Sequence, residues 1–173
     1  GRTDGRAVEP RLVDLAQLEA LANGIQLTPG QSDLVRELAC SGRRVQLAIA
    51  PAGTGKTTAM RVLGSAWTES GGAVIGLAPS AAAAKALADQ LEVQCDTLAK
   101  LNWSLDHPEQ SAPAWMAAIG PESLVIIDEA GMADTLSLDR AIAEVMIRGG
   151  SVRLIGDDRQ LSAIGAGGVL RDI

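Results

Sequence analysis

Short apolar runs alternate with helical patterns along this chain, and no other feature constrains its fold as much. Four runs have the length and apolar character of strands: RRVQLAIA (43–50), GGAVIGLAPS (71–80), SLVIIDEA (123–130) and SVRLIGDD (151–158). Helices are expected around them, at about 8–22, 28–41, 56–69, 81–92, 97–105, 113–120 and 134–148. The alternation predicts an α/β fold, with a mostly parallel sheet covered by helices on both faces. In such sheets, ligands bind beyond the carboxyl ends of the strands.

Composition narrows the class of protein. The 173 residues, 47% of them hydrophobic, suffice for one sizeable core, and we expect residues 27–173 to form it after an N-terminal linker and helix in residues 1–26. The formal net charge of -6 argues against a protein that binds nucleic acid through a broad basic surface, although a local channel for a single strand remains compatible with it. Cys40 and Cys95 lack the spacing of a metal site.

Targeting signals are not apparent in the sequence. No apolar run is long enough to span a membrane, and the opening GRTDGRAVEP lacks the apolar core of a signal peptide. We therefore expect a cytoplasmic protein without a membrane partner.

The stretch LAIAPAGTGKTTAM (47–60) joins an expected strand to an expected helix through a glycine loop. It matches the phosphate-binding (Walker A) pattern G-x-x-x-x-G-K-[ST] except at the first glycine, which is Ala50 here. Glycine lets successive backbone N–H groups turn toward one anion, and the following helix adds its positive N-terminal end. The alternative is a glycine turn followed by an exposed lysine. On the first interpretation, the nucleotide-binding residues are Ala52, Gly53, Thr54, Gly55, Lys56, Thr57 and Thr58.

Two ligands would meet at this loop, ATP and Mg²⁺. The Lys56 ammonium would reach the terminal phosphates and act in catalysis, and the Thr57 hydroxyl would coordinate Mg²⁺. Asp128 follows a run of apolar residues, where a Walker B carboxylate would hold the metal. Glu129 would orient and deprotonate the attacking water as a catalytic residue. The alternative for this pair of carboxylates is a solvated acidic strand end.

Three segments carry a family resemblance: APAGTGKTT, VIIDEAGM and IGDDRQLSAIGAGGVLRDI. In this order they resemble motifs I, II and III of superfamily 1 DNA helicases, in particular the RecD-like helicase portion of conjugative relaxases of the TraA/TraI type. The resemblance covers about Leu27 to the C-terminus and implies the first RecA-like domain of a P-loop NTPase motor. It also implies two partners, single-stranded DNA and a second RecA-like domain of the same parent chain.

The resemblance implies roles for further residues. Gln31 corresponds to a glutamine that reads the adenine edge, although its place three residues after Thr28 also fits a capping box. Gln160 corresponds to the residue that senses the γ-phosphate and couples it to DNA, which makes it a catalytic candidate. Trp103 could stack on a base or pack in the core. The residues with implied DNA contacts are Pro79, Ser80, Thr97 and Trp103.

The other large ring side chains are interpreted without a functional role. Trp67 and Trp115 are expected to pack in the core. His107 lies in a polar stretch just before Pro108, so we expect it to be solvated rather than to act as a general base.

Motif III is the last motif in the chain, and superfamily 1 helicases complete their ATP site with arginines from the second RecA-like domain. The expected function is therefore that of an ATP-binding motor domain of a DNA helicase or translocase, which alone binds nucleotide but hydrolyses it poorly. One alternative is a non-catalytic module that binds single-stranded DNA. A small P-loop kinase is another, although neither a lid nor a phosphate-acceptor pocket is evident in the sequence.

Overall fold

A parallel sheet lies between two layers of helices in the computed structural model, which describes residues 3–49 and 55–156. In chain order the elements are α1 (Pro10–Ala22), α2 (Pro29–Cys40), β1 (Val45–Ile49), α3 (Lys56–Glu69), β2 (Ala73–Ala78), α4 (Ala81–Leu91), β3 (Gln94–Thr97), α5 (Leu98–Asp106), α6 (Ala114–Ala117), β4 (Ser123–Ile127), the 3₁₀ turn η1 (Ala130–Met132), α7 (Thr135–Ile147) and β5 (Ser151–Gly156).

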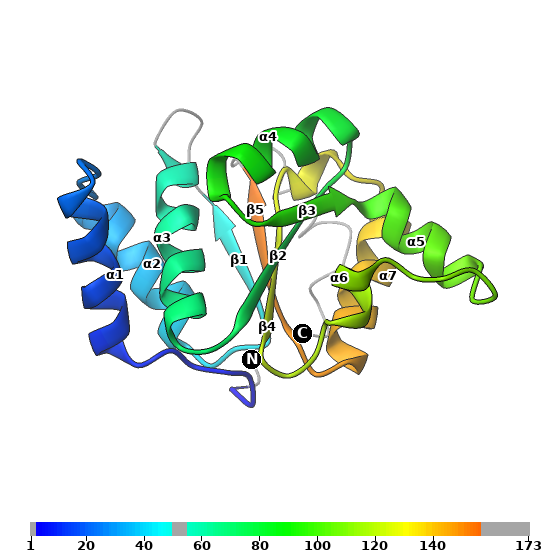
Figure 1. The fold of residues 1–173 in the computed structure, drawn as a ribbon, viewed down its shortest axis with the longest axis horizontal. Coiled ribbons are helices and arrows are strands. Elements are labelled where there is room, and N and C mark those ends of the chain that lie inside the picture. Colours follow the sequence, from blue (N-terminus) through cyan, green and yellow to red (C-terminus); the bar gives the residue numbers. More distant parts are fainter. Residues whose placement is uncertain (1–2, 50–54, 157–173) are drawn as a thin grey trace.

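The five described strands are all parallel and lie in the order β1-β5-β4-β2-β3 (Figure 1). β5 therefore separates β1, which leads into the glycine loop, from β4, which leads into the two carboxylates. The register aligns Val152 of β5 with Val45 on one side and Val125 on the other. Because the strands run the same way, their carboxyl ends share one edge, as the predicted α/β fold requires.

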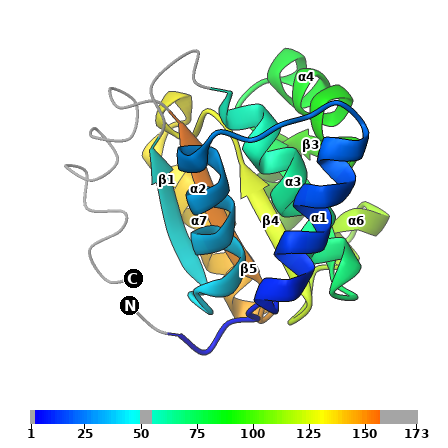
Figure 2. The same cartoon turned by 90° about the vertical axis from the view of Figure 1, so that its left-hand side faces the viewer.

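Side chains along each strand alternate between two apolar cores. Helices α1 to α4 pack over one face, and α5 and α7 pack over the other; Figure 2 shows α1, α2 and α3 in front of the sheet. In β4, Leu124 and Ile126 belong to the first core, and Val125 and Ile127 belong to the second. All residues of β4 are buried, which confirms the prediction of a strand covered on both faces.

Most of the predicted elements are confirmed. α3 begins at Lys56 and ends at Glu69 as expected, whereas α6 is a single turn, shorter than its apolar segment indicated. β3 was not predicted, because three of its four residues are polar and its described pairing is with β2 alone. Such a strand forms through its backbone and carries little hydrophobic periodicity.

The N-terminal residues pack against the first core. Val13 and Ala16 of α1 are buried there, as is Val8 in the segment that precedes the helix. The backbone N–H of Val8 donates to the Ala39 carbonyl at 2.8 Å, near the end of α2. One side of α1 thus packs within the described structure, whereas three leucines of the same helix are exposed.

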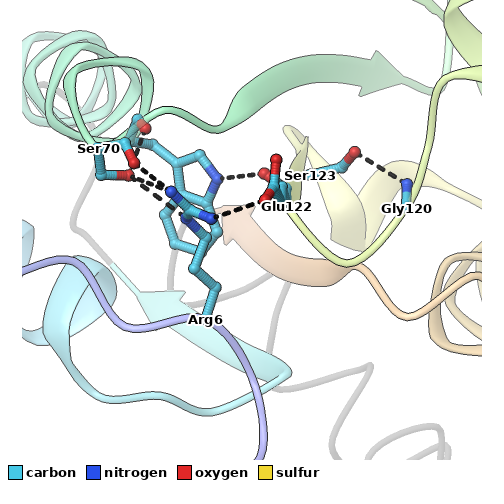
Figure 3. Close-up of polar contacts among 6 residues, drawn as sticks. Arg6, Ser70, Gly120, Glu122 and Ser123 are labelled. Atoms are coloured by element: carbon cyan, nitrogen blue, oxygen red, sulfur yellow. Dashed lines mark hydrogen bonds and ion pairs between the residues drawn. The ribbon is translucent and has the colours of Figure 1, made fainter.

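Arg6 joins this N-terminal segment to two other elements (Figure 3). Its guanidinium donates to the carbonyl and the hydroxyl of Ser70 at the end of α3, and Nη1 lies 3.8 Å from the Glu122 carboxylate. The indole N–H of Trp67 donates to the Glu122 carbonyl at 3.0 Å. Trp67 is fully buried, which confirms its expected packing role. These contacts lie at the edge of the sheet opposite the strands' carboxyl ends.

β5 carries a buried charge at its centre. Arg153 is 0% exposed, and burial lowers its pKa to about 10. Its Nε donates to the Leu38 carbonyl at 2.9 Å, and its Nη1 donates to the Val152 carbonyl at 2.9 Å. Leu38 lies in the last turn of α2, so the guanidinium offsets the partial negative charge at that helix end.

Candidate nucleotide site and nucleic-acid edge

The carboxyl edge of the sheet brings together residues that the sequence predicted to be functional. Gly55 and Lys56 follow β1, and Asp128 follows β4. Pro79 follows β2, and Thr97 ends β3. Four other predicted site residues lie outside the described residues: Ala52, Gly53, Thr54 and Gln160.

Gly55 occupies a backbone conformation that suits glycine. It is the N-cap of α3 with φ 73° and ψ 31°, in the left-handed region that side chains disfavour. A Cβ placed on Gly55 would lie 2.3 Å from Nε2 of Gln31. The backbone angle therefore favours glycine at this position, and a larger residue would also have to displace the Gln31 amide.

Gln31 links α2 to the start of α3. Its Nε2 donates to the Gly55 carbonyl at 3.1 Å, while its Oε1 accepts from the Thr28 N–H at 2.8 Å. The Thr28 hydroxyl in turn accepts from the Gln31 N–H at 3.1 Å, so the predicted capping box is confirmed. The adenine-reading role of Gln31 stays a prediction. In the described structure, this amide lies against the last residue of the glycine loop.

Lys56 and Asp128 form an ion pair between two distant motifs. Lys56 Nζ lies 3.4 Å from Asp128 Oδ1, with the two side chains 25% and 20% exposed. The same carboxylate oxygen accepts from the Glu129 N–H at 2.9 Å. The partly buried setting strengthens this attraction relative to a pair in open water. The ammonium predicted to bind phosphate and the carboxylate predicted to bind metal thus lie side by side.

The donors near this pair fit magnesium. Thr57 and Thr58 lie in the first turn of α3 and are half-buried, and Asp128 supplies a carboxylate beside Lys56. Mg²⁺ prefers oxygen ligands and is usually held by one or two protein groups together with phosphates and water. Within residues 3–49 and 55–156, no group of three or more His, Cys, Asp or Glu residues could hold a metal. The site therefore suits a metal that arrives with a nucleotide.

Glu129 has a strained backbone. Its φ of 51° and ψ of 38° place it in the left-handed region, between the end of β4 and η1. A side chain in this region costs roughly 1–3 kcal/mol, and such residues concentrate at functional sites. From this strained turn the Glu129 backbone N–H donates to Asp128, and the residue is half-buried.

Two residues with implied DNA contacts are helix caps on the same edge. The Ser80 hydroxyl accepts from the Ala83 N–H at 3.1 Å and begins α4. The Thr97 hydroxyl accepts from the Lys100 N–H at 3.0 Å and begins α5. The N-terminal end of a helix attracts anions, so both positions suit contact with a phosphate backbone.

Trp103 lies at the surface of α5, so the alternative of a core tryptophan is wrong. It is 43% exposed, and its ring stacks on His107 with centroids 4.1 Å apart and planes at 17°. Lys100 Nζ lies 4.9 Å from the indole centroid. The expectation of a solvated His107 is also corrected, because His107 is only half-exposed and its Nδ1 lies 2.8 Å from the Trp103 carbonyl. Trp115 is half-buried and donates to Asp96 at 3.2 Å.

Comparison with known proteins agrees with this arrangement. A model of the AAA domain family matches residues 26–173. The conjugal transfer protein TraA of Rhizobium radiobacter is 28% identical over 172 residues, which are 98% of this chain and 14% of that protein. A probable conjugal transfer protein TraA of Sinorhizobium fredii is 28% identical over 154 residues, which are 89% of this chain and 13% of that protein. The chain therefore spans a small part of the length of these relatives.

A solved structure supports the fold. The crystal structure of the UvsW helicase from bacteriophage T4 has a TM-score of 0.58 at 16% identity, over 82% of this chain and 58% of that chain. At that identity the likeness concerns the fold alone. Together, the comparisons confirm an α/β fold of the P-loop NTPase type and the resemblance to TraA-type conjugal transfer proteins. Among the described helices, none has the length and apolar character needed to cross a membrane.

Proposed function

The chain belongs to the AAA domain family, and on this basis we propose that it is the ATP-binding motor domain of an ATP-dependent DNA helicase or translocase that serves conjugation. One observation supports this most strongly. The ammonium that follows the glycine loop and the carboxylate that follows β4 meet at 3.4 Å, although 72 residues separate them in the chain. Neither a simple glycine turn nor a solvated acidic strand end requires that meeting.

The proposed mechanism begins with phosphate binding at the start of α3. The N–H groups of Lys56, Thr57 and Thr58 lie in the first turn of the helix, where backbone donors lack helical partners and the helix dipole favours an anion. The Lys56 ammonium exchanges Asp128 for the terminal phosphates, which carry more negative charge. Mg²⁺, when bound, would neutralise phosphate charge and polarise the transferred group.

Hydrolysis also requires a water molecule that attacks the terminal phosphate. Asp128 and the Thr57 hydroxyl would hold the metal, so Glu129 is left to orient the water and accept its proton. Glu129 directly follows the proposed metal ligand in the chain, at a strained backbone position. A general base has to lie within hydrogen-bond reach of the water that it deprotonates, and this position would put the Glu129 carboxylate near a nucleotide held by its neighbours.

Single-stranded DNA is the proposed substrate, along which the motor moves. The caps of α4 and α5 lie at the carboxyl edge, and Trp103 lies exposed one helical turn beyond Ala99. Phosphates at helix N-termini and a base near an aromatic ring are the contacts that single-strand binders use. Arginines from a second RecA-like domain would complete the ATP site, and Gln160 would couple it to the strand.

Nucleotide binding is tested by calorimetry with a non-hydrolysable ATP analogue and Mg²⁺. Lys56→Ala should abolish measurable binding, because it removes the charge that meets the terminal phosphates. Lys85→Ala is the matched control, since Lys85 is 80% exposed on α4 and pairs only with Asp89 in the described structure. Equal binding by wild type and Lys56→Ala would contradict a working phosphate site.

Hydrolysis is tested in a longer polypeptide that includes the second RecA-like domain. Glu129→Gln should bind the analogue normally and lose DNA-stimulated ATP turnover, because the amide cannot accept the proton of water. Unchanged turnover would contradict the assigned role. The alternative of a non-catalytic module predicts single-strand binding that ignores nucleotide in both proteins.

A further inference from the structure

A small crevice opens at the carboxyl edge of the sheet, away from the Lys56 and Asp128 pair. Its volume is about 150 Å³. Segments that follow three different strands line it: Pro79 after β2, Leu98 after β3, and Met132 and Ala133 after β4. The start of α7 closes it with Asp134 and Ser137. The crevice thus forms only when β2, β3 and β4 have assembled side by side.

The size and walls of the crevice suit one flat ring. Pockets for drug-sized ligands span about 300–1,000 Å³, so this crevice admits a much smaller group. Five of the seven lining residues are apolar, although the surface they and the two polar residues expose to the crevice is more polar than apolar, and Met132 is 66% exposed. A methionine thioether packs well against the face or edge of a ring because it is flexible and polarisable.

The polar side of the crevice is an acceptor. Asp134 Oδ1 accepts from the Ser137 N–H at 2.8 Å as the cap of α7, and the exposed carboxylate keeps lone pairs for a ligand. Hydrogen bonds from the Ser137 backbone and side chain hold the pKa of Asp134 below its usual range, so the group is ionised at neutral pH. An ionised carboxylate accepts hydrogen bonds and donates none. The occupant should therefore present N–H donors and no negative charge at that point.

The surroundings of the crevice favour a nucleic-acid strand over a free small molecule. The capped N-termini at Ser80 and Thr97 begin directly beside two of its lining residues, Pro79 and Leu98. Phosphates can lie at these helix ends while a base turns into the crevice. Trp103 lies one helical turn beyond Ala99, another lining residue, and offers an exposed aromatic surface for a neighbouring base.

We infer that this crevice is a nucleobase subsite that selects bases with an exocyclic amino group over thymine. The inference rests on the proposed function, because it assumes that a single strand follows the carboxyl edge. Adenine, cytosine and guanine each present an amino group from which the Asp134 carboxylate can accept a hydrogen bond. Thymine presents a single N–H between two carbonyl oxygens, and those oxygens repel the carboxylate.

Methionine-methyl NMR tests the inference on the whole chain. The chain has four methionines, and Met60 and Met116 are 3% and 2% exposed, so their methyl groups serve as internal controls. Labelled protein is titrated with homo-oligomers of dA, dC and dT of equal length, with and without an Mg²⁺–ATP analogue. The Met132 signal, assigned with Met132→Leu, should move when dA or dC is added. The affinities for dA and dC should be about fivefold or more above the affinity for dT.

A single substitution should reverse the preference. Asp134→Asn keeps a good helix cap but places an amide N–H₂ donor where a carboxylate oxygen was. The variant should bind dT at least as well as dA and dC. Asp139→Asn is the matched control, because it removes the same charge from the exposed side of α7 outside the crevice. It should keep the wild-type preference.

The possible outcomes separate this inference from the proposed function. Equal affinity for the three oligomers, or the same behaviour in Asp134→Asn and Asp139→Asn, overturns base selection. A shift of the Trp103 indole without any shift of Met132 places the strand elsewhere, which overturns the crevice but keeps the proposed DNA track. No response to any oligomer in either nucleotide condition overturns the inference together with the DNA part of the proposed function.

Discussion

The ammonium of Lys56 lies 3.4 Å from the carboxylate of Asp128, so the group proposed for phosphate and the group proposed for metal neutralise each other. Under the proposed function, this pairing makes the two ligands interdependent. A nucleotide would have to compete with Asp128 for Lys56, whereas Mg²⁺ would withdraw Asp128 from Lys56 and leave the ammonium to the phosphates. The strength of nucleotide binding should therefore depend on whether the metal is present.

Asp128→Asn should change nucleotide affinity in opposite directions with and without Mg²⁺. Without Mg²⁺, the variant should bind an ATP analogue about twofold to fivefold more tightly than wild type, because no carboxylate competes for Lys56. With Mg²⁺, the variant should bind more weakly than wild type, because a metal ligand is lost. Calorimetry measures the affinity for the analogue once with Mg²⁺ and once with EDTA. Loss of affinity in both conditions would show that Asp128 does not compete for the ammonium.

Gly55→Ala should damage the loop, whereas Gly30→Ala should not. The first change places a Cβ 2.3 Å from Gln31 Nε2 at a φ of 73°, and the second meets only the Thr28 hydroxyl at 4.0 Å. We expect Gly55→Ala to lose about tenfold or more in analogue affinity through strain of about 1–2 kcal/mol. Calorimetry measures the affinity, and thermal unfolding should show that Gly30→Ala is as stable as wild type or more so.

The double variant Gly55→Ala with Gln31→Ala separates the two causes of that damage. Removing the glutamine relieves the contact but leaves the backbone angle unchanged. Partial recovery of analogue affinity is therefore expected. Full recovery would mean that the left-handed backbone contributes nothing, and wild-type affinity in Gly55→Ala alone would contradict the described geometry.

Glu129→Gly and Glu92→Gly should have similar effects on stability but different effects on activity. The two glutamates are the described non-glycine residues with positive φ, at 51° and 56°. Glycine relieves that strain, so each variant should unfold at the same or a higher denaturant concentration, with a gain of up to about 1 kcal/mol. Loss of the Glu92 ion pair with Arg61 removes little, because both side chains are well exposed.

ATP turnover distinguishes these two variants. Glu129→Gly should lose DNA-stimulated hydrolysis in the longer polypeptide, and Glu92→Gly should keep it. Chemical denaturation and turnover are measured on both proteins. Strong destabilisation of Glu129→Gly would show that its side chain supports the fold rather than the chemistry.

Cys95 should react slowly with alkylating reagents at neutral pH. Burial raises the pKa of its thiol to about 11, against an ordinary value of 9.0. In a Cys40→Ser background, the folded chain at pH 8 should react roughly a hundredfold more slowly than the unfolded chain, since only the thiolate attacks. The rate in the folded chain should keep rising with pH beyond 9. A plateau near pH 9 would contradict the raised pKa.

The same shift has a consequence for stability at alkaline pH. Between pH 9 and about 11, the unfolded chain releases the Cys95 proton while the folded chain keeps it. The contribution of this thiol to stability is therefore fully present below pH 9 and is lost as the pH rises through that window.

Local patterns were sufficient to predict much of the fold. The Thr28 and Gln31 capping box, the start of α3 at Lys56 and the burial of β4 all follow from residues that are close in sequence. Hydrogen bonds and periodicity within a few residues determine such features. The meeting of Lys56 with Asp128 was also predictable, because parallel strands share a carboxyl edge.

Features that depend on distant packing were not predictable in this way. The pattern SVRLIG indicates a strand, but only the position of the α2 end explains why Arg153 can be fully buried. β3 depends on backbone pairing with β2, so its polar sequence carried no signal. The crevice around Met132 and Asp134 needs three strand ends at once, and no single segment of sequence contains that information.

The order of strands also affects how the chain can fold during synthesis. β1 has β5 as its described partner, and Val45 pairs with Val152. A ribosome adds about 5–20 residues per second, so roughly 5–20 s separate the appearance of β1 from that of β5, about a hundred residues later. Until then, the strand that leads into the glycine loop lacks its neighbour. The nucleotide site is therefore among the first parts of the domain to be synthesised and among the last that can be assembled.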